Sequence, residues 1–310
     1  MNAEAEFLQG RFVDAQICLE NTYVHIAENG QENMVLCCDF LALRLALCTE
    51  LTLSYTIAER RKELLRRHNI TWVTLFDSAC AYYYALSGQI TQIPVLFREH
   101  QLSTVNFLAP GKPMMELIEN QVYLAQQEYA KVIGRSEGLL AVCEAMHYAL
   151  VALHVQIQTA AAYECLGKRT EARNCLKCAL QIALPDQFYL PFVENYEYLE
   201  ELLQREIQTA DAAEHVFLTK VTELGKNCQK RYGALRKTHM FPEIAAELTE
   251  QEQRIIELLA ERLSNREIAE KLFLSEGTIK QYINRIYAKL QISGDVRTKR
   301  RQLIELLTTD

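Results

Sequence analysis

A stretch near the C-terminal end, residues 248–290, has the sequence LTEQEQRIIELLAERLSNREIAEKLFLSEGTIKQYINRIYAKL. In it Thr249 is followed by Glu252, and Ser264 is followed by Glu267. Both pairs fit the capping box, in which a hydroxyl and a carboxylate satisfy free backbone amides at the start of a helix. The stretch therefore predicts two helices with satisfied first turns.

The second of these helices is expected over residues 265–272, and a third over about 276–290 with Ser275 as its N-cap. Ala269 is small enough to let two helices cross closely. The third helix carries an apolar stripe at spacings of four, three and four, made by Ile279, Ile283, Ile286 and Leu290. Two short helices joined by a tight turn in this way predict a helix-turn-helix.

At these residues the chain resembles the LuxR-type helix-turn-helix family, the C-terminal output module of many bacterial transcription regulators. The resemblance is gapless and covers Leu248-Thr249, Leu258-Leu259-Ala260, Leu263 to Ala269, Leu274-Ser275, Thr278 through Ile286, and Lys289-Leu290. Arg262 stands where the family usually has glycine, and Tyr282 replaces a common histidine. The tail Arg297-Thr298-Lys299-Arg300 lacks the alanine that often follows.

The resemblance implies a small four-helix, winged-helix-like domain that binds double-stranded DNA, with the third helix in the major groove. We expect three outward side chains of that helix to reach base edges: Lys280, Gln281 and Asn284. Phosphate contacts are expected from Ser264, Asn265, Arg266, Thr278, Arg285 and Lys289. The alternative for each residue is a solvated helix face, but clustering opposite the apolar stripe favours contact.

A last helix is expected over residues 298–307, with more apolar surface than a small domain needs. We expect Leu303, Ile304 and Leu307 to pair two modules, giving a homodimer on half-sites about one helical turn, roughly 34 Å, apart. If the chain is an activator, RNA polymerase is a further expected partner.

The chain has 310 residues, enough for two domains, and a formal net charge of −7. That charge is unevenly divided, because residues 248–310 hold 11 Lys and Arg against 10 Asp and Glu, leaving the front part at −8. An acidic front part resists nonspecific attachment to nucleic acid and leaves DNA contact to the C-terminal module.

The sequence has no apolar run of about 18 residues, so it predicts no membrane span. The first residues, MNAEAEFLQG, have no secretory pattern, so we expect a cytoplasmic protein. Ten cysteines are expected to be reduced, mostly buried residues. Cys175 and Cys178 form the CxxC of the chain, but no second pair or histidine pair accompanies them, so no metal site is expected. Gly111-Lys112-Pro113 is a loop turn and not a phosphate-binding loop. Neither a cofactor nor an enzymatic function is predicted.

Residues 1–205 alternate apolar residues at helical spacing with turn signals, which predicts an all-α fold. The segment 153–187 carries small and apolar residues that match a tetratricopeptide repeat, a helix pair of about 34 residues: Ala160, Tyr163, Leu166, Gly167, Ala172, Leu176 and Ala179. Other repeats are degenerate. We therefore expect a tetratricopeptide-like helical array for sensing or oligomerisation.

Three parts follow: the array at 1–205, a partly helical linker at 206–243 and the DNA-binding domain at 244–310. This order resembles the C-terminal half of MalT-like regulators without their ATPase domain. The resemblance implies an array that senses a small-molecule inducer or a protein partner. The alternative is an interaction scaffold with a vestigial DNA-binding module. The operator, the sense of regulation and any longer parent chain stay open.

Overall fold

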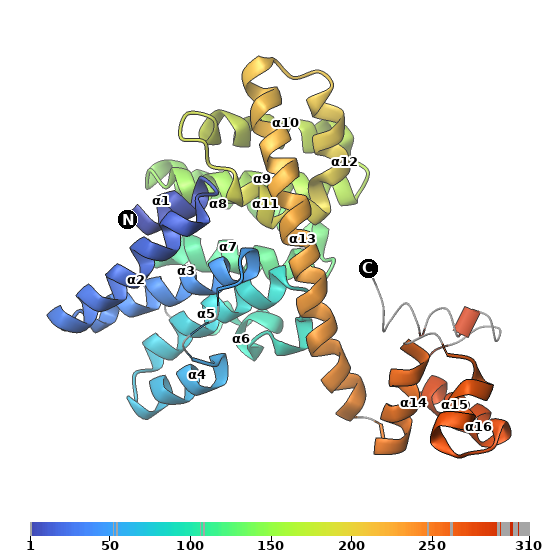
Figure 1. Ribbon diagram of the computed structural model, residues 1–310. Coiled ribbons are helices and arrows are strands. Elements are labelled where there is room, and N and C mark those ends of the chain that lie inside the picture. The colour runs from blue at the N-terminus through green and yellow to red at the C-terminus, as the bar shows by residue number, and fades with distance from the viewer. Residues whose placement is uncertain are drawn as a thin grey trace. The chain divides into compact units, whose positions relative to one another are not determined.

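The protein consists of helices and connecting turns in a computed structural model, with no strand in the part described (Figure 1). This confirms the predicted all-α fold. The described residues are 2–51, 53, 55–105, 107, 109–246, 248–260, 263–289, 292, 298, 299 and 303. The chain divides into two units, residues 1–232 and residues 233–310. No helix among the described residues has the length and apolar character needed to cross a membrane.

The first unit is a succession of helices in which chain neighbours pack together. Its helices are α1 (Asn2–Leu8), α2 (Phe12–Asn29), α3 (Val35–Cys48), α4 (Ile57–Arg66), α5 (Ile70–Leu86), α6 (Val95–Arg98), α7 (Lys112–Ala125), α8 (Tyr129–Ala145), α9 (Ala149–Cys165), α10 (Arg169–Ala183), α11 (Leu190–Glu194), α12 (Tyr196–Ile207) and the start of α13 (Ala212–Ala246). Short 3₁₀ turns lie between some of them: η1 (Glu32–Met34), η2 (Ile90–Gln92), η3 (Leu102–Thr104) and η4 (Ala109–Gly111).

One turn geometry recurs between α7 and α11. The residues with left-handed backbone there are spaced twenty apart, with φ between 55° and 72°: Gln127, His147, Gly167 and Gln187. After each, the next amide returns to a carbonyl five residues back, as in Lys168 N–H to Tyr163 O at 2.9 Å. This is the hydrogen-bond pattern of a Schellman helix end. One helix therefore occupies about 20 residues, and a pair is longer than the 34-residue repeat that the sequence suggested.

The residues that suggested the repeat do lie where helices meet. Ala160 on α9 and Ala172, Leu176 and Ala179 on α10 are all fully buried. Gly167 makes the turn between the two helices with φ +72°. Small side chains at the crossing let α9 and α10 pack closely, as the pattern predicted.

A buried ion pair joins α3 to α11 in the first unit. The Arg44 guanidinium donates to Glu194 from Nε at 2.7 Å and from Nη2 at 3.2 Å, and to Glu4 from Nη1 at 2.7 Å. The Tyr82 hydroxyl donates to the same Glu194 carboxylate at 2.9 Å. Tyr82 is therefore a core residue, whereas its neighbours Tyr83 and Tyr84 are half-buried.

The first unit continues past the boundary expected at residue 205. Apolar residues of α13 up to Tyr232 are buried at helical spacing: Phe217, Leu218, Val221, Leu224, Cys228 and Tyr232. At Gly225 a Cβ would lie 2.4 Å from Cγ of Tyr196, so α13 meets α12 where no side chain fits. Most of the expected linker at 206–243 is thus α13, whose first part belongs to the core of the first unit.

The second unit contains α14 (Glu250–Ala260), α15 (Asn265–Leu272) and α16 (Glu276–Lys289). The bounds of α15 and α16 agree with the sequence prediction to within one residue. Of the expected last helix, residues 298, 299 and 303 are described, and all three are helical. The core of this unit is made by one cluster of buried side chains: Leu248, Ile255, Ile256, Leu259, Ile268, Ala269, Ile279, Ile283, Ile286, Tyr287 and Leu303.

Candidate nucleic-acid interface

The start of α15 is a complete capping box. Ser264 Oγ accepts the Glu267 amide at 3.3 Å, and the Glu267 carboxylate accepts the Ser264 amide at 2.7 Å. The hydrogen bonds from Ser264 lower the pKa of Glu267. The carboxylate therefore stays ionised beside the positive end of the helix, where it is stabilised.

The start of α14 is closed in the same way, and it also holds the end of α16. Glu252 accepts the Thr249 amide at 2.8 Å and the Thr249 hydroxyl at 3.0 Å. Lys289 Nζ donates to the same carboxylate at 2.7 Å. Burial raises the pKa of Glu252, but the hydrogen bonds from Lys289 and Thr249 outweigh burial and leave it below its usual value.

A left-handed residue makes the turn between α15 and α16. Phe273 has φ 54° and ψ 41°, and the Leu274 amide returns to Ala269 O at 3.0 Å. Ser275 Oγ then accepts the Thr278 amide at 3.0 Å, which confirms the expected N-cap of α16. The tight turn and the capped start fix the direction in which α16 leaves α15.

The inner face of α16 carries the predicted apolar stripe, whose last member, Leu290, lies outside the described residues. Ile279, Ile283 and Ile286 are buried against α14 and α15, and Ala269 is buried at the crossing. Tyr287 is a further core residue that the sequence analysis did not select. Its position four residues after Ile283 was the signal for it.

The three side chains expected at base edges share the outer face of α16. Lys280, Gln281 and Asn284 are all exposed. At about 100° per residue they occupy an arc of about 100°, on the opposite side of the helix from the isoleucines. Lys280 Nζ lies 3.5 Å from Glu276 Oε1, one turn earlier. An exposed pair of this kind is worth less than about 1 kcal/mol, so it leaves the ammonium available.

The residues expected at phosphates lie in two groups. Ser264 and Arg266 are exposed and Asn265 is half-buried, all at the start of α15. On α16, Thr278 is half-buried, while Arg285 is exposed with its guanidinium 5.6 Å from the centre of the Tyr282 ring. Lys289 is exposed too, but its ammonium already holds Glu252. The α16 members of this group lie beside the polar arc of Lys280, Gln281 and Asn284. Contact of all six residues with phosphate stays a prediction.

The residues expected to pair two copies are placed differently from the prediction. Leu303 is fully buried in the core of its own unit, because it packs with the cluster formed by α14 and α16. A side chain in that position offers no surface to a second copy. Ile304 and Leu307 lie outside the described residues.

Residues 246–300 match the family of bacterial regulatory proteins described as luxR. This segment is a LuxR-family helix-turn-helix domain. Over 43 residues the chain is 49% identical to the DNA-binding transcriptional activator DevR/DosR of Mycobacterium tuberculosis, which is 14% of this chain and 20% of that protein. Over 90 residues it is 36% identical to the uncharacterized transcriptional regulatory protein YxjL of Bacillus subtilis, 29% of this chain and 39% of that protein.

The chain therefore spans well under half the length of both relatives. No solved structure matches the chain. The LuxR-family assignment describes the second unit, whereas the helical array of the first unit is known from its own structure alone.

Proposed function

We propose that the protein is a sequence-specific DNA-binding transcriptional regulator in which α16 enters the major groove. One observation carries this proposal: Lys280, Gln281 and Asn284 form an exposed polar arc opposite a buried stripe, on a helix of a LuxR-family domain. A polar face on a helix that is buried on its other side is the surface that reads base edges in helix-turn-helix proteins.

The chemistry of the three side chains suits base edges. A lysine ammonium donates to O6 and N7 of guanine, and the amides of Gln281 and Asn284 can each make two hydrogen bonds to adenine. Gly277 and Ala288 are exposed on the same side of α16 and add almost no bulk there. The arc can therefore approach the floor of the groove without obstruction.

Phosphate contacts would position the domain on the duplex. Arg266 at the start of α15 and Arg285 on the flank of α16 are charged and exposed, and the other members of this group are Ser264, Asn265, Thr278 and Lys289. Such contacts supply affinity that falls with salt and carry no sequence information. Lys289 would have to share its ammonium between phosphate and Glu252.

Two copies would bind adjacent half-sites, with contacts from Ile304 and Leu307 in place of the buried Leu303. The helical array would sense a small molecule or a protein partner inside the cytoplasm, and RNA polymerase would be contacted if the protein activates transcription.

The test is selection of duplexes from a random library with the full chain, followed by titration of the selected duplex. Lys280→Ala should weaken specific binding by about 1–3 kcal/mol and relax the preference at one base position. Lys177→Ala, at an exposed position on α10 of the first unit, is the matched control and should change nothing. If Lys280→Ala weakens binding to all sequences equally, Lys280 is a phosphate contact and the assignment fails.

A second candidate is an interaction scaffold with a vestigial DNA-binding domain. It is favoured by exposed apolar side chains at helical spacing along α2, where Val13 is 73%, Ile17 52% and Val24 58% exposed. A stripe of this kind suits a protein partner. Failure to select any duplex from the library would leave this candidate standing.

A further inference from the structure

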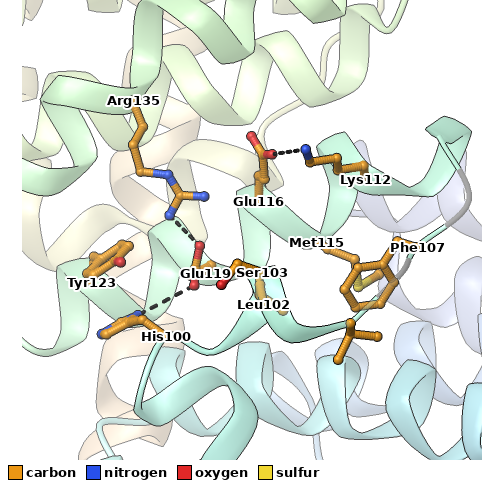
Figure 2. Close-up of a pocket in the computed structure, with 11 residues that line it drawn as sticks. His100, Leu102, Ser103, Phe107, Lys112, Met115, Glu116, Glu119, Tyr123 and Arg135 are labelled. Carbon is orange, nitrogen blue, oxygen red and sulfur yellow. Dashed lines mark ion pairs between the residues drawn. The ribbon is translucent and has the colours of Figure 1, made fainter.

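The helical array contains a pocket of about 490 Å³ beside α7 (Figure 2). That volume falls within the range of small-molecule sites. The walls come from α7, α8 and the segment that follows α6. Leu102, Phe107 and Met115 give it an apolar side, while charged groups of both signs line the remainder.

At one end of the pocket the His100 ring faces the Glu119 carboxylate (Figure 2). Gln126 Nε2 donates to Arg98 O at 3.0 Å, so its Oε1 is the atom that meets His100 Nε2 at 2.7 Å. In the neutral form of the ring, His100 Nε2 therefore carries the proton and Nδ1 carries a lone pair. Nδ1 lies 3.7 Å from Glu119 Oε1 and has no hydrogen-bond partner in the described part of the chain.

The His100 ring and the Glu119 carboxylate are each fixed by a neighbouring side chain. The His100 ring stacks on Tyr123 with 3.8 Å between ring centres. Glu119 is buried, and its other oxygen pairs with Arg135 Nη1 at 2.5 Å. A group with several N–H donors, such as an ammonium, can satisfy Nδ1 and Oε1 together.

At the other end of the pocket lies the Lys112 ammonium, which is only weakly paired. Lys112 is 67% exposed, and its Nζ is 3.8 Å from Glu116 Oε1, beyond hydrogen-bond length. The positive charges of one lysine and one arginine in the lining, Lys112 and Arg135, balance the negative charges of its two glutamates. A bound molecule therefore adds the least electrostatic cost when its own net charge is zero. Seven residues separate Lys112 from Glu119 along α7, which places their backbones about 10 Å apart.

We propose that this pocket binds a linear zwitterion, with its ammonium between His100 and Glu119, its carboxylate at Lys112 and an apolar spacer along Met115. An ω-amino acid has this chemistry. So does a short peptide, since about three extended residues span the same distance at about 3.4 Å each. That the bound molecule acts as a signal rests on the proposed sensor role of the array, whereas its binding in the pocket does not.

The test is calorimetric titration of the full chain, without DNA, with 6-aminohexanoate, 8-aminooctanoate and triglycine. Glycine tests the spacing, hexylamine and hexanoate each lack one charge, and 1,6-hexanediol lacks both. We expect at least one of the long zwitterions to bind about tenfold more tightly than every one of these four controls. The better of 8-aminooctanoate and triglycine distinguishes an amino acid from a peptide as the source.

Variants at each end then locate the site. Lys112→Met and Glu119→Gln should each weaken binding of the long zwitterion about tenfold, while the exposed matched controls Lys177→Met and Glu137→Gln should not. If Glu119→Gln disturbs folding, Lys112→Met decides alone, since that side chain is largely exposed. Binding of none of the probes, equal binding of the diol, or full binding by Lys112→Met would overturn the proposal. Because no DNA is present, none of these outcomes bears on duplex selection.

Discussion

Three successive helices of the array begin by other means than the helices of the LuxR-family domain. In the array, α8, α9 and α10 start without any side-chain cap, and each follows a left-handed residue that ends the preceding helix. In the LuxR-family domain α14, α15 and α16 start at the hydroxyls of Thr249, Ser264 and Ser275. The three array helices are held by packing along many neighbours, although elsewhere in the array α4 and α5 are capped by Thr56 and Asn69. The LuxR-family domain has a small core, and each of its three helices has a local hydrogen bond at its start.

The largest effect is expected where the array buries charge. Arg44→Ala leaves Glu194, whose side chain is 1% exposed, with no cation, which should cost about 3–5 kcal/mol of stability. Arg173→Ala, which breaks a pair exposed at the surface, is the control and should cost less than about 1 kcal/mol. Fluorescence of Trp72, the single tryptophan, follows urea unfolding of this unit alone. Equal costs for the two variants would contradict buried pairing at Arg44.

A second test concerns packing between α12 and α13. Gly225→Ala places a methyl group against the Tyr196 ring and should destabilise the first unit by about 1–3 kcal/mol. Gly134→Ala, in α8, meets no atom within 4 Å and should instead stabilise by about 0.5–1 kcal/mol through helix propensity. Stability changes of opposite sign in the same urea titration support α13 as part of the array. If both variants were more stable than the wild type, the first part of α13 would be a loose linker.

The difference in capping can be tested directly. Ser264→Ala should destabilise α15 by about 0.5–2 kcal/mol, seen as faster hydrogen exchange of the amides at Ile268 and Ala269. Glu128→Ala removes the residue at the start of α8, whose side chain makes no capping bond, so exchange in α8 should not change. Equal acceleration in both helices would contradict the difference between the uncapped α8 and the capped α15.

The smallest change in stability is expected when the pH is lowered. The pKa of Glu252 lies below its usual value in the folded domain, so its share of stability is present near neutral pH. That share is lost as pH falls from about 5 through the lowered pKa. Exchange at Ile255 and Ile256 should accelerate over this range. Glu252→Gln should flatten the pH dependence of exchange at Ile255 and Ile256. An unchanged slope in that variant would assign the pH dependence to other groups.

The sequence predicted the second unit more accurately than the first. Caps at Thr249, Ser264 and Ser275 are local chemistry, so α15 and α16 were located to within one residue. The array turns at Gln127, His147 and Gln187 carry no glycine, so nothing in the sequence marked their left-handed backbone. They persist because packing on both sides holds them.

Long-range contacts account for most of the remainder. Residues after 205 were expected to be a linker because their apolar spacing has no partner until α12 lies against it. Leu303 was expected at a surface, yet it completes a core whose other members are up to 55 residues earlier. The pocket was not anticipated, since Lys112 looked like part of a loop turn and His100 meets Glu119 only through the fold.

The most direct test of the central claim is the ratio of dissociation constants for a scrambled duplex and for the selected duplex, measured with the full chain at one physiological salt concentration. A sequence-specific regulator predicts a ratio of at least about 10³. Lys280→Ala should reduce that ratio about tenfold or more, since it removes a base contact. Equal affinity of the wild-type chain for the two duplexes would contradict the account.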